Sequence, residues 1–337
     1  MTTTILLTGA SGLIGFRILL HALEAGHNVR VAVRSEEKAQ KVASNPAILK
    51  LGAAAGERLS SVVIPDLTVD GVFDSVLQGV THIIHTGSPV GLPELDPRTE
   101  IYEPTVKMAA NLLKSALKAP TVQRVVITTS GLANIGFAAG PETVSAATRV
   151  PPPDPIPETF SNGVEAYITG KLVEARDTDT FIQTQNAHFT VSRIFPGFVF
   201  GRNELSLNTA MMQTQNSSNN LMMMGMLGGE VPFPLFGRYA HVDDVAELHM
   251  RVALEDRCAG KDFGIAFEVD YDTIFDHVEK RYPEAVKAGV FKRGTVPIQP
   301  VVYDSSDAEA LLGKVKSFEE AVLDVAGQYL ELLKAEQ

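Results

Sequence analysis

The amino-acid sequence predicts an α/β fold with a doubly wound parallel sheet and a smaller C-terminal lobe. Three observations support this prediction. The chain opens with a short apolar run, a glycine-rich turn and a helical apolar pattern. Short apolar or β-branched runs then alternate with amphipathic stretches up to about residue 200, and the pattern beyond is less regular. Strands that alternate with helices at this pace are typical of parallel sheets. We assign residues 1–200 to the sheet domain, with 239–257 returning to it, and 201–238 and 258–337 mainly to the lobe and a C-terminal helix.

The expected elements follow from hydrophobic periodicity along the chain. Short apolar or β-branched runs predict strands at residues 5–7, 28–33, 61–64, 81–85 and 122–129, and we expect 193–201 to finish the sheet. Apolar residues at helical spacing predict helices at 13–23, 106–117 and 318–333. Asp243 and Asp244 open another amphipathic stretch, so we interpret them as a cap and first-turn charges of a helix, not as catalysts.

Composition limits the class of protein. With 337 residues, 45% hydrophobic and 20% charged, the chain is typical of a globular protein with a large core. The net charge of −11 argues against a nucleic-acid or anionic-membrane surface. No apolar run approaches the ~20 residues of a membrane span, and no signal peptide is evident. Cys258 is the only cysteine, which suits a reducing, cytoplasmic location, and the histidines show no metal-ligand spacing.

The glycine-rich turn predicts a dinucleotide site. Three glycines at intervals of three residues lie between the apolar run 5–7 and the helical pattern that begins at Leu13. A strand, a glycine turn and a helix together direct free backbone N–H groups and the positive end of a helix dipole at a pyrophosphate. This is the nucleotide-binding turn of a Rossmann-type sheet, although an ordinary tight turn is the alternative. The expected cofactor contacts are Thr8, Gly9, Ser11, Gly12, Leu13, Ile14 and Gly15.

The end of the second strand favours NADP(H) over NAD(H). In NAD sites an acidic residue commonly accepts hydrogen bonds from the ribose hydroxyls at this place. Here Arg34 and Ser35 stand there, with Lys38 one helical turn further. Arginine can bind a 2′-phosphate with two parallel hydrogen bonds. The alternative is a solvated arginine at the start of a charged helix.

Two later strand ends are also expected to border the cofactor. Asp66 and Leu67 follow the third strand, where Asp66 can cap the next helix, bind the adenine amino group, or do both. The segment Thr86, Gly87 and Ser88 follows the fourth strand, and its backbone is placed to run beside the second ribose and the phosphates. We interpret His85 as a packed strand-end residue.

Ser130, Tyr167 and Lys171 are the candidate catalytic residues. Ser130 follows the fifth strand, and the carboxyl ends of strands face the ligand crevice in open α/β sheets. Tyr167 and Lys171 are four residues apart, so they share one face of a helix. A lysine ammonium about 4 Å from a phenolate stabilises it by about 4 kcal/mol at an effective dielectric constant of ~20. Any helix can contain such a pair, but its order after the glycine turn and the strand-end serine predicts a proton-transfer site beside a hydride carrier.

With these motifs the chain resembles the extended short-chain dehydrogenases/reductases. It is most similar to the branch of dihydroflavonol reductase, cinnamoyl-CoA reductase and fungal NADPH-dependent aldehyde/ketone reductases. The similar segments are 8–15, 33–39, 85–89, 103–106, 167–171, 195–201 and 239–246. The resemblance implies NADPH as donor and a Ser130–Tyr167–Lys171 triad. In it, the tyrosine protonates the carbonyl oxygen, the serine steadies that oxygen, and the lysine holds the nicotinamide ribose. It also implies that Pro196 and Val199 lie along the nicotinamide.

The chain departs from the family pattern in a few places. Thr129 and Gly131 flank Ser130 where the family often has serine and alanine. Asn111 falls later than the catalytic asparagine of shorter relatives, so we leave it out of the site. The loop 132–157, rich in proline after Val150, matches the family poorly and is expected to be irregular, exposed and close to the substrate.

The substrate pocket is predicted from a methionine-rich stretch. Residues 211–226 contain six of the nine methionines, and methionine adapts to ligands of varied shape. One hypothesis is that this stretch lines a roomy apolar pocket for an apolar or aromatic carbonyl compound. Ordinary helix packing is the alternative. The expected substrate contacts are Leu132, Phe198, Met222, Met223 and Phe233.

The predicted function is therefore NADPH-dependent reduction of an aldehyde or ketone to an alcohol. A nucleotide-sugar epimerase or dehydratase of the same fold is one alternative. Gly131 and Leu132 weaken it, because the sugar 4,6-dehydratases carry an Asp-Glu pair there. A non-catalytic NADP sensor is another, although such proteins typically lose the tyrosine or the lysine. We expect no metal and no nucleic-acid partner, and a monomer or homodimer.

Overall fold

The computed structural model describes residues 3–138, 140, 142–215 and 217–337. Parts of the expected loop 132–157 and of the methionine-rich stretch therefore lie outside the described residues. A seven-stranded sheet in the order β11-β7-β5-β4-β1-β2-β3 forms the centre, and its neighbouring strands pair in parallel. Its strands are β1 (Thr4–Thr8), β2 (Asn28–Val33), β3 (Leu59–Val63), β4 (His82–His85), β5 (Arg124–Thr128), β7 (Thr190–Pro196) and β11 (Phe263–Ile265).

The last strand of the sheet differs from the prediction. We expected residues 193–201 to finish the sheet, but only β7 belongs to it, and β8 (Phe198–Phe200) pairs with β10 (Arg238–His241) in a second sheet. β11 forms the edge of the central sheet next to β7, with which it pairs. This strand has three residues and contains Gly264, so it carries no periodic signal and forms through its pairing with β7.

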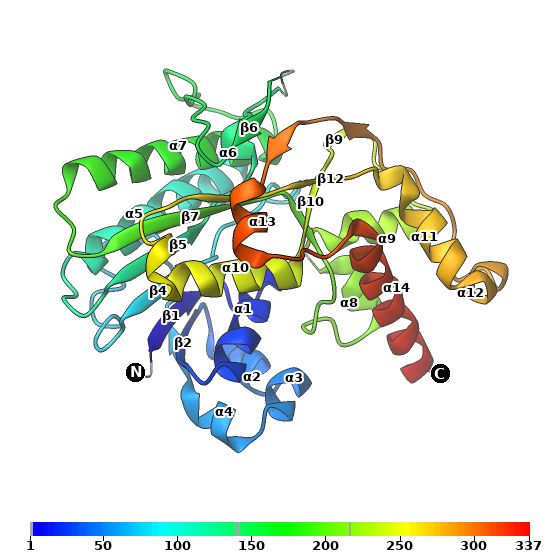
Figure 1. The fold of residues 1–337 in the computed structure, drawn as a ribbon, viewed down its shortest axis with the longest axis horizontal. Coiled ribbons are helices and arrows are strands. Elements are labelled where there is room, and N and C mark those ends of the chain that lie inside the picture. The colour runs from blue at the N-terminus through cyan, green and yellow to red at the C-terminus, as the bar shows by residue number, and fades with distance from the viewer. Residues whose placement is uncertain (1–2, 139, 141, 216) are drawn as a thin grey trace.

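Helices cover both faces of the central sheet, because successive side chains of each strand point to opposite faces. Ile5 and Leu7 of β1 pack into the core beneath α1 (Leu13–Glu24) and α10 (Val242–Leu254), whereas Leu6 packs into the core beneath α5 (Glu103–Ala116). The long helix α7 (Gly163–Thr184) lies beside α5 (Figure 1). The remaining elements of this part are α2 (Glu36–Ala43), α3 (Pro46–Lys50), α4 (Ala53–Arg58), η1 (Pro97–Tyr102), α6 (Leu132–Ile135), β6 (Val144–Ser145), η2 (Asp256–Cys258) and α13 (Ser306–Leu312).

A separate hydrophobic core lies among α8 (Thr209–Thr214), α9 (Asn219–Leu227), α11 (Ile274–Arg281) and α14 (Phe318–Ala335), the helices at the right of Figure 1. It includes Phe200, Tyr239, Phe318 and the buried methionines of α8 and α9. The other elements here are β9 (Leu235–Phe236), β12 (Phe267–Glu268), η3 (Tyr271–Thr273), α12 (Pro283–Lys287) and β13 (Ile298–Gln299). The short strand β14 (Tyr303–Asp304) pairs instead with β6. A capping box between Ser317 and Glu320 begins α14, whose apolar face docks on this core.

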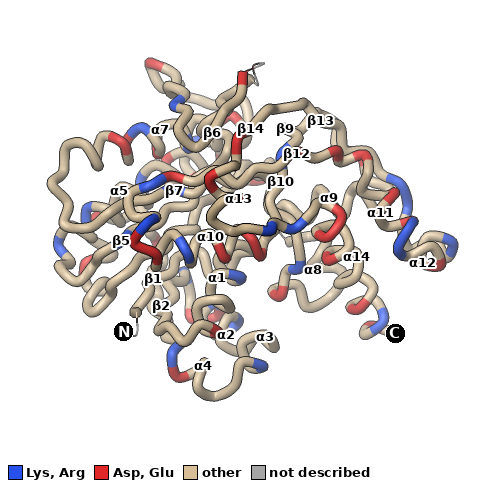
Figure 2. The backbone as a smooth tube through the Cα atoms, viewed as in Figure 1, with Lys and Arg blue, Asp and Glu red and all other residues tan. Residues whose placement is uncertain are grey.

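The surface carries mixed charge. Figure 2 shows basic and acidic positions interspersed along the chain. Among the described residues, no helix combines the length and the apolar character needed to cross a membrane.

Candidate functional site

The glycine turn forms a narrow cradle at the start of α1. Gly9 has φ of 77°, a left-handed conformation that favours glycine. A Cβ atom on Gly15 would lie 2.6 Å from the carbonyl carbon of Gly9 and 2.7 Å from Thr86 Oγ1, so no side chain fits there. Gly12 is the N-cap of α1, and no described residue caps this helix with a side chain, so side chains there leave its first N–H groups free. Together these features fit the pyrophosphate of a dinucleotide.

Hydrogen bonds join the ends of β1 and β4 beneath this cradle. The Thr8 hydroxyl lies 2.7 Å from His85 Nδ1 and accepts a hydrogen bond from the Gly87 amide at 3.2 Å. Thr86 Oγ1 donates to the Thr8 carbonyl at 2.8 Å. His85 is 3% exposed, and burial, reinforced by the charge of Lys171, lowers its pKa to about 3. His85 is therefore a neutral, packed residue, as expected, and the segment 86–88 is held beside the glycine turn.

Two cations lie together at the start of α2. Arg34 is exposed directly after β2, and the Ser35 side chain caps the helix by accepting from the Lys38 amide. Burial, followed by the nearby charge of Arg34, lowers the pKa of Lys38. An arginine and a lysine beside a helix N-terminus form a local anion site in a chain of net charge −11.

Asp66 forms a local turn. Its carboxylate accepts from the Thr68 amide at 2.8 Å and from the Thr68 hydroxyl at 2.6 Å, and these bonds lower its pKa. Asn111, which we left out of the site, donates to the Thr68 carbonyl at 2.7 Å and so fixes this loop on α5. The element that follows β3 is β4, so Asp66 does not cap a helix as predicted; it forms a turn with Thr68 instead. Contact of Asp66 or Leu67 with adenine stays a prediction.

Lys171 is buried next to the strand end that carries Ser130. Its ammonium donates to the Thr128 carbonyl at 3.4 Å, and its side chain is 1% exposed. Ser130 is 9% exposed, and its hydroxyl accepts from the Leu132 amide at 3.2 Å. Tyr167 lies one turn before Lys171 on α7 and is half-buried against the hydrophobic cluster that includes residues of η1 and α7. The fold therefore places Lys171 beside the serine strand end, with the tyrosine on the same helix face.

Glu174 is a residue of this site that the sequence reasoning missed. Its Oε2 lies 2.8 Å from Lys171 Nζ, and its side chain is 3% exposed. Its other oxygen, Oε1, is buried with no hydrogen-bond partner among the described residues. The signal was present in the sequence: Tyr167, Lys171 and Glu174 are spaced i, i+4, i+7, which places all three on one face of a helix.

The predicted substrate residues differ in their surroundings. Phe198 is half-buried and contacts Phe200 and Tyr271, Leu132 is half-buried in α6, and Phe233 is 52% exposed. Met222 and Met223 are 0% and 2% exposed and belong to the C-terminal core. This burial favours the packing role of these methionines over contact with a ligand. Pro196 and Val199, expected along the nicotinamide, are also buried, at the junction of the two sheets.

Replacing Met222 with alanine is expected to lower the free energy of unfolding by about 2–3 kcal/mol, since it removes a fully buried side chain. The order of activity among ketone substrates should stay unchanged. Met224→Ala on the same helix is the control. Met224 is only half-buried, so its replacement should lower the free energy of unfolding by less. Urea denaturation measures both variants. A reordered substrate series with unchanged stability would instead support the pocket-wall hypothesis.

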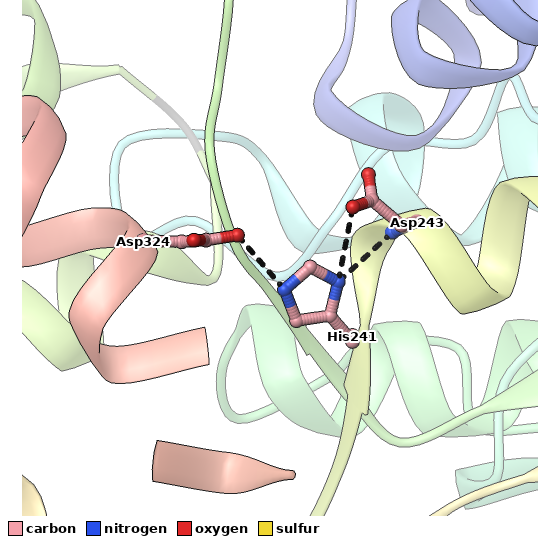
Figure 3. A group of neighbouring side chains, drawn as sticks. All are labelled: His241, Asp243 and Asp324. Atoms are coloured by element: carbon pink, nitrogen blue, oxygen red, sulfur yellow. Dashed lines mark hydrogen bonds and ion pairs between the residues drawn. The ribbon is translucent and has the colours of Figure 1, made fainter. Parts of the chain in front are cut away.

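His241, Asp243 and Asp324 form the cluster of possible metal-ligating side chains in Figure 3. His241 Nε2 lies 3.1 Å from Asp324, and its Nδ1 accepts from the Asp243 amide, so His241 is the N-cap of α10. The Asp243 carboxylate is bonded by Arg17 of α1 and by Lys316. Two cations already neutralise this carboxylate, so the cluster is an ionic link between α1, α10 and α14. Asp243 and Asp244 occupy the first turn of α10, as expected, but the cap is His241.

Replacing Asp243 with asparagine is expected to lower the free energy of unfolding at pH 7 by about 2 kcal/mol, the scale of a hydrogen bond to a charged group. Burial alone would raise the pKa of Asp243, but the bonds from Arg17 and Lys316 outweigh it and hold this pKa well below its usual range. The stabilisation is therefore complete above the unfolded-state pKa of about 3.9 and is lost as the pH falls below it. Urea titrations from pH 7 to pH 3 should show the difference from wild type shrinking, and the exposed Asp307→Asn serves as control.

Comparison with known proteins identifies the family. The model of the NAD dependent epimerase/dehydratase family matches residues 5–266. The chain belongs to this family. It is 34% identical to the NAD-dependent epimerase/dehydratase ALT6 of Alternaria alternata, over 97% of this chain and 98% of that protein. It is 32% identical to the ketoreductase CTB6 of Cercospora nicotianae, over 97% and 95%. The structure of Gre2 from Candida albicans in complex with NADPH has a TM-score of 0.81 at 21% identity, over 98% of this chain and 99% of that chain.

Membership of the NAD dependent epimerase/dehydratase family confirms the predicted resemblance to the extended short-chain dehydrogenases/reductases. The doubly wound parallel sheet is confirmed by the structure and by the likeness to Gre2. The prediction of a nicotinamide-dependent oxidoreductase is confirmed with them. The roles of individual site residues stay predictions, as does the division into two domains.

Proposed function

We propose that the protein is an NADPH-dependent carbonyl reductase that converts an aldehyde or ketone to an alcohol, with Tyr167 as general acid. One observation carries this proposal: α7 buries the Lys171 ammonium beside the strand end that carries Ser130, and Tyr167 lies on the same helix face. A related protein, CTB6, is named a ketoreductase.

The residues present fit NADP(H). The Gly9–Gly15 cradle and the free N–H groups of α1 suit the pyrophosphate, and Arg34 and Lys38 suit the 2′-phosphate. Segment 86–88 would run beside the phosphates and the second ribose, and Lys171 would hold the nicotinamide ribose. When bound, NADPH supplies the hydride that reaches the carbonyl carbon.

The chain's own residues supply the proton and the orientation of the substrate. Tyr167 donates its phenolic proton to the carbonyl oxygen, and Ser130 donates a hydrogen bond to the same oxygen, which places the carbonyl. The Lys171 ammonium stabilises the phenolate that remains, since burial strengthens the attraction between the two charges. The substrate is an apolar or aromatic carbonyl compound that lies near Leu132 and Phe198. A cytoplasmic location, and a monomer or homodimer, remain part of the proposal.

A panel assay tests the proposal against both alternatives. The protein is mixed with NADPH and a series of aromatic and aliphatic aldehydes and ketones, and the loss of NADPH absorbance is followed. Turnover with at least one class of carbonyl compound is the expected result. NADPH binding without turnover across the panel would favour a sensor. Conversion of a UDP-sugar without net loss of cofactor would favour an epimerase, an activity that the family description includes.

A further inference from the structure

The ion pair between Lys171 and Glu174 is unusual because it lies inside the proposed catalytic site and is almost fully buried. An ammonium has three N–H donors. Glu174 Oε2 and the Thr128 carbonyl take two of them, at 2.8 Å and 3.4 Å. One donor is left for a ligand or for Tyr167, so the carboxylate fixes both the position and the free direction of the ammonium.

Among the described groups around Lys171, Glu174 is the one that balances its positive charge. η1, α5 and α6 pack against α7. On η1, Arg98 lies over the Tyr102 ring and donates to the Pro157 carbonyl. The ionisable groups of α5 lie toward the surface: Glu103 pairs with Lys107 at 2.9 Å, and Lys114 is exposed. α6 carries no ionisable side chain.

Two buried histidines complete the surroundings of Lys171. Burial, and then the charge of Lys171, lowers the pKa of His85 to about 3, and burial lowers that of His249 to about 4. His249 is hydrogen-bonded to the Thr128 hydroxyl at 2.6 Å. Both rings are therefore neutral near pH 7, and within the described part of the chain Glu174 is the one acidic group paired with Lys171.

Packing alone accounts poorly for this glutamate. Its Oε1 is buried without a hydrogen-bond partner among the described residues, and leaving a buried polar atom unpaired is costly. Replacing a buried ion pair by apolar residues is often neutral or stabilising. Among the described residues, only one oxygen of Glu174 accepts a hydrogen bond. The donor is Lys171, which the proposed function places beside the reacting tyrosine.

We propose that Glu174 is a positioning residue, which holds the Lys171 ammonium and offsets its charge so that Tyr167 keeps its proton for delivery to the carbonyl oxygen. The inference rests on the proposed function, because it assigns Tyr167 as the proton donor. With Lys171 alone, the positive charge favours loss of the phenolic proton; the carboxylate weakens that effect. The site is thereby poised to donate a proton, as reduction requires.

The test follows ionisation of Tyr167 directly, without turnover. The chain has seven tyrosines and no tryptophan, so phenolate absorbance near 295 nm is unobscured by indole. Subtracting the titration of Tyr167→Phe from that of the wild type isolates Tyr167, and each Glu174 variant is paired with its own Tyr167→Phe double variant. In Glu174→Gln the isolated titration should move to lower pH by about one unit, the effect of one charge about 10 Å away at a dielectric constant of ~20.

Three further variants make this result specific. Asp177→Asn lies one turn further along α7, and its carboxylate pairs with the exposed Arg176, so its titration should match the wild type. Glu174→Asp retains the charge and should restore most of the wild-type midpoint. Glu174→Ala carries the same expectation as the glutamine variant and keeps the test open if that variant does not fold.

The outcomes separate this inference from the proposed function. An unchanged midpoint in Glu174→Gln, or a shift to higher pH, would overturn the role of Glu174 even if the protein reduces carbonyl compounds. Absence of carbonyl turnover in the wild type would overturn the proposed function, while the titration would still report on Glu174. In an active enzyme, the alkaline limb of the kcat/KM profile for reduction should move in the same direction as the titration.

Discussion

Replacing Tyr167 with phenylalanine is expected to lower kcat for carbonyl reduction by about 100- to 10,000-fold, the range that general acid catalysis contributes. The variant removes only the phenolic oxygen. Its half-buried ring can still pack against the hydrophobic cluster between η1 and α7, so the fold should be retained. NADPH affinity, measured by cofactor fluorescence, should stay within about threefold of wild type, because the phosphate contacts proposed for Arg34 and the glycine cradle are untouched. Stopped-flow absorbance gives the rate of the chemical step.

Tyr329→Phe is the matched control for this experiment. Tyr329 lies on α14, where its ring packs 6.0 Å from that of Phe291 in the C-terminal core, away from the proposed site. The control should keep wild-type kcat. Turnover of Tyr167→Phe within tenfold of the wild type would refute the assignment of Tyr167 as the acid, and weak cofactor binding would show that the phenol serves the cofactor instead.

The central sheet could be predicted because its signals are local. The apolar run in β1, the β-branched residues of β2 and the glycine turn each specify their own conformation, and the structure contains them at nearly the predicted residues. The edge strand β11 could not be predicted in the same way. Its three residues pair with β7, which precedes it by about 70 positions, so the strand exists only through tertiary contact.

The candidate site likewise combines residues that could be predicted from the sequence with one that depends on tertiary contact. The order of Gly9, Ser130, Tyr167 and Lys171 is visible in the sequence. That they meet at one site could be predicted, because the carboxyl ends of strands in a parallel sheet lie at one edge. The partner of Lys171 is less evident. Glu174 has the spacing of a residue on the same helix face, but a glutamate on a helix is usually solvated, and only the tertiary packing around α7 buries it. Burial likewise favours packing over ligand contact for Met222, which the sequence left open.

Replacing Arg34 with aspartate is expected to lower the ratio of kcat/KM for NADPH to kcat/KM for NADH by more than about 100-fold. The arginine is exposed directly after β2, beside the N-terminus of α2, where a 2′-phosphate is expected. Losing a charge-assisted hydrogen bond costs about 1.5–3 kcal/mol, and the new carboxylate repels the phosphate in addition. The same carboxylate can accept hydrogen bonds from the ribose hydroxyls of NADH, so activity with NADH should rise or hold.

Lys41→Asp separates direct contact from the general electrostatic field, because it makes the same change of charge on α2, the helix that begins beside Arg34. Lys41 pairs with Glu37 at 2.9 Å, and its side chain is 72% exposed, so it needs no role in cofactor binding. Its replacement should alter the cofactor ratio by less than about threefold, since exposed charges are well screened at 0.15 M salt. If Arg34→Asp changed the ratio no more than Lys41→Asp does, Arg34 would be a surface charge, and the NADP(H) preference would have to arise from another part of the site.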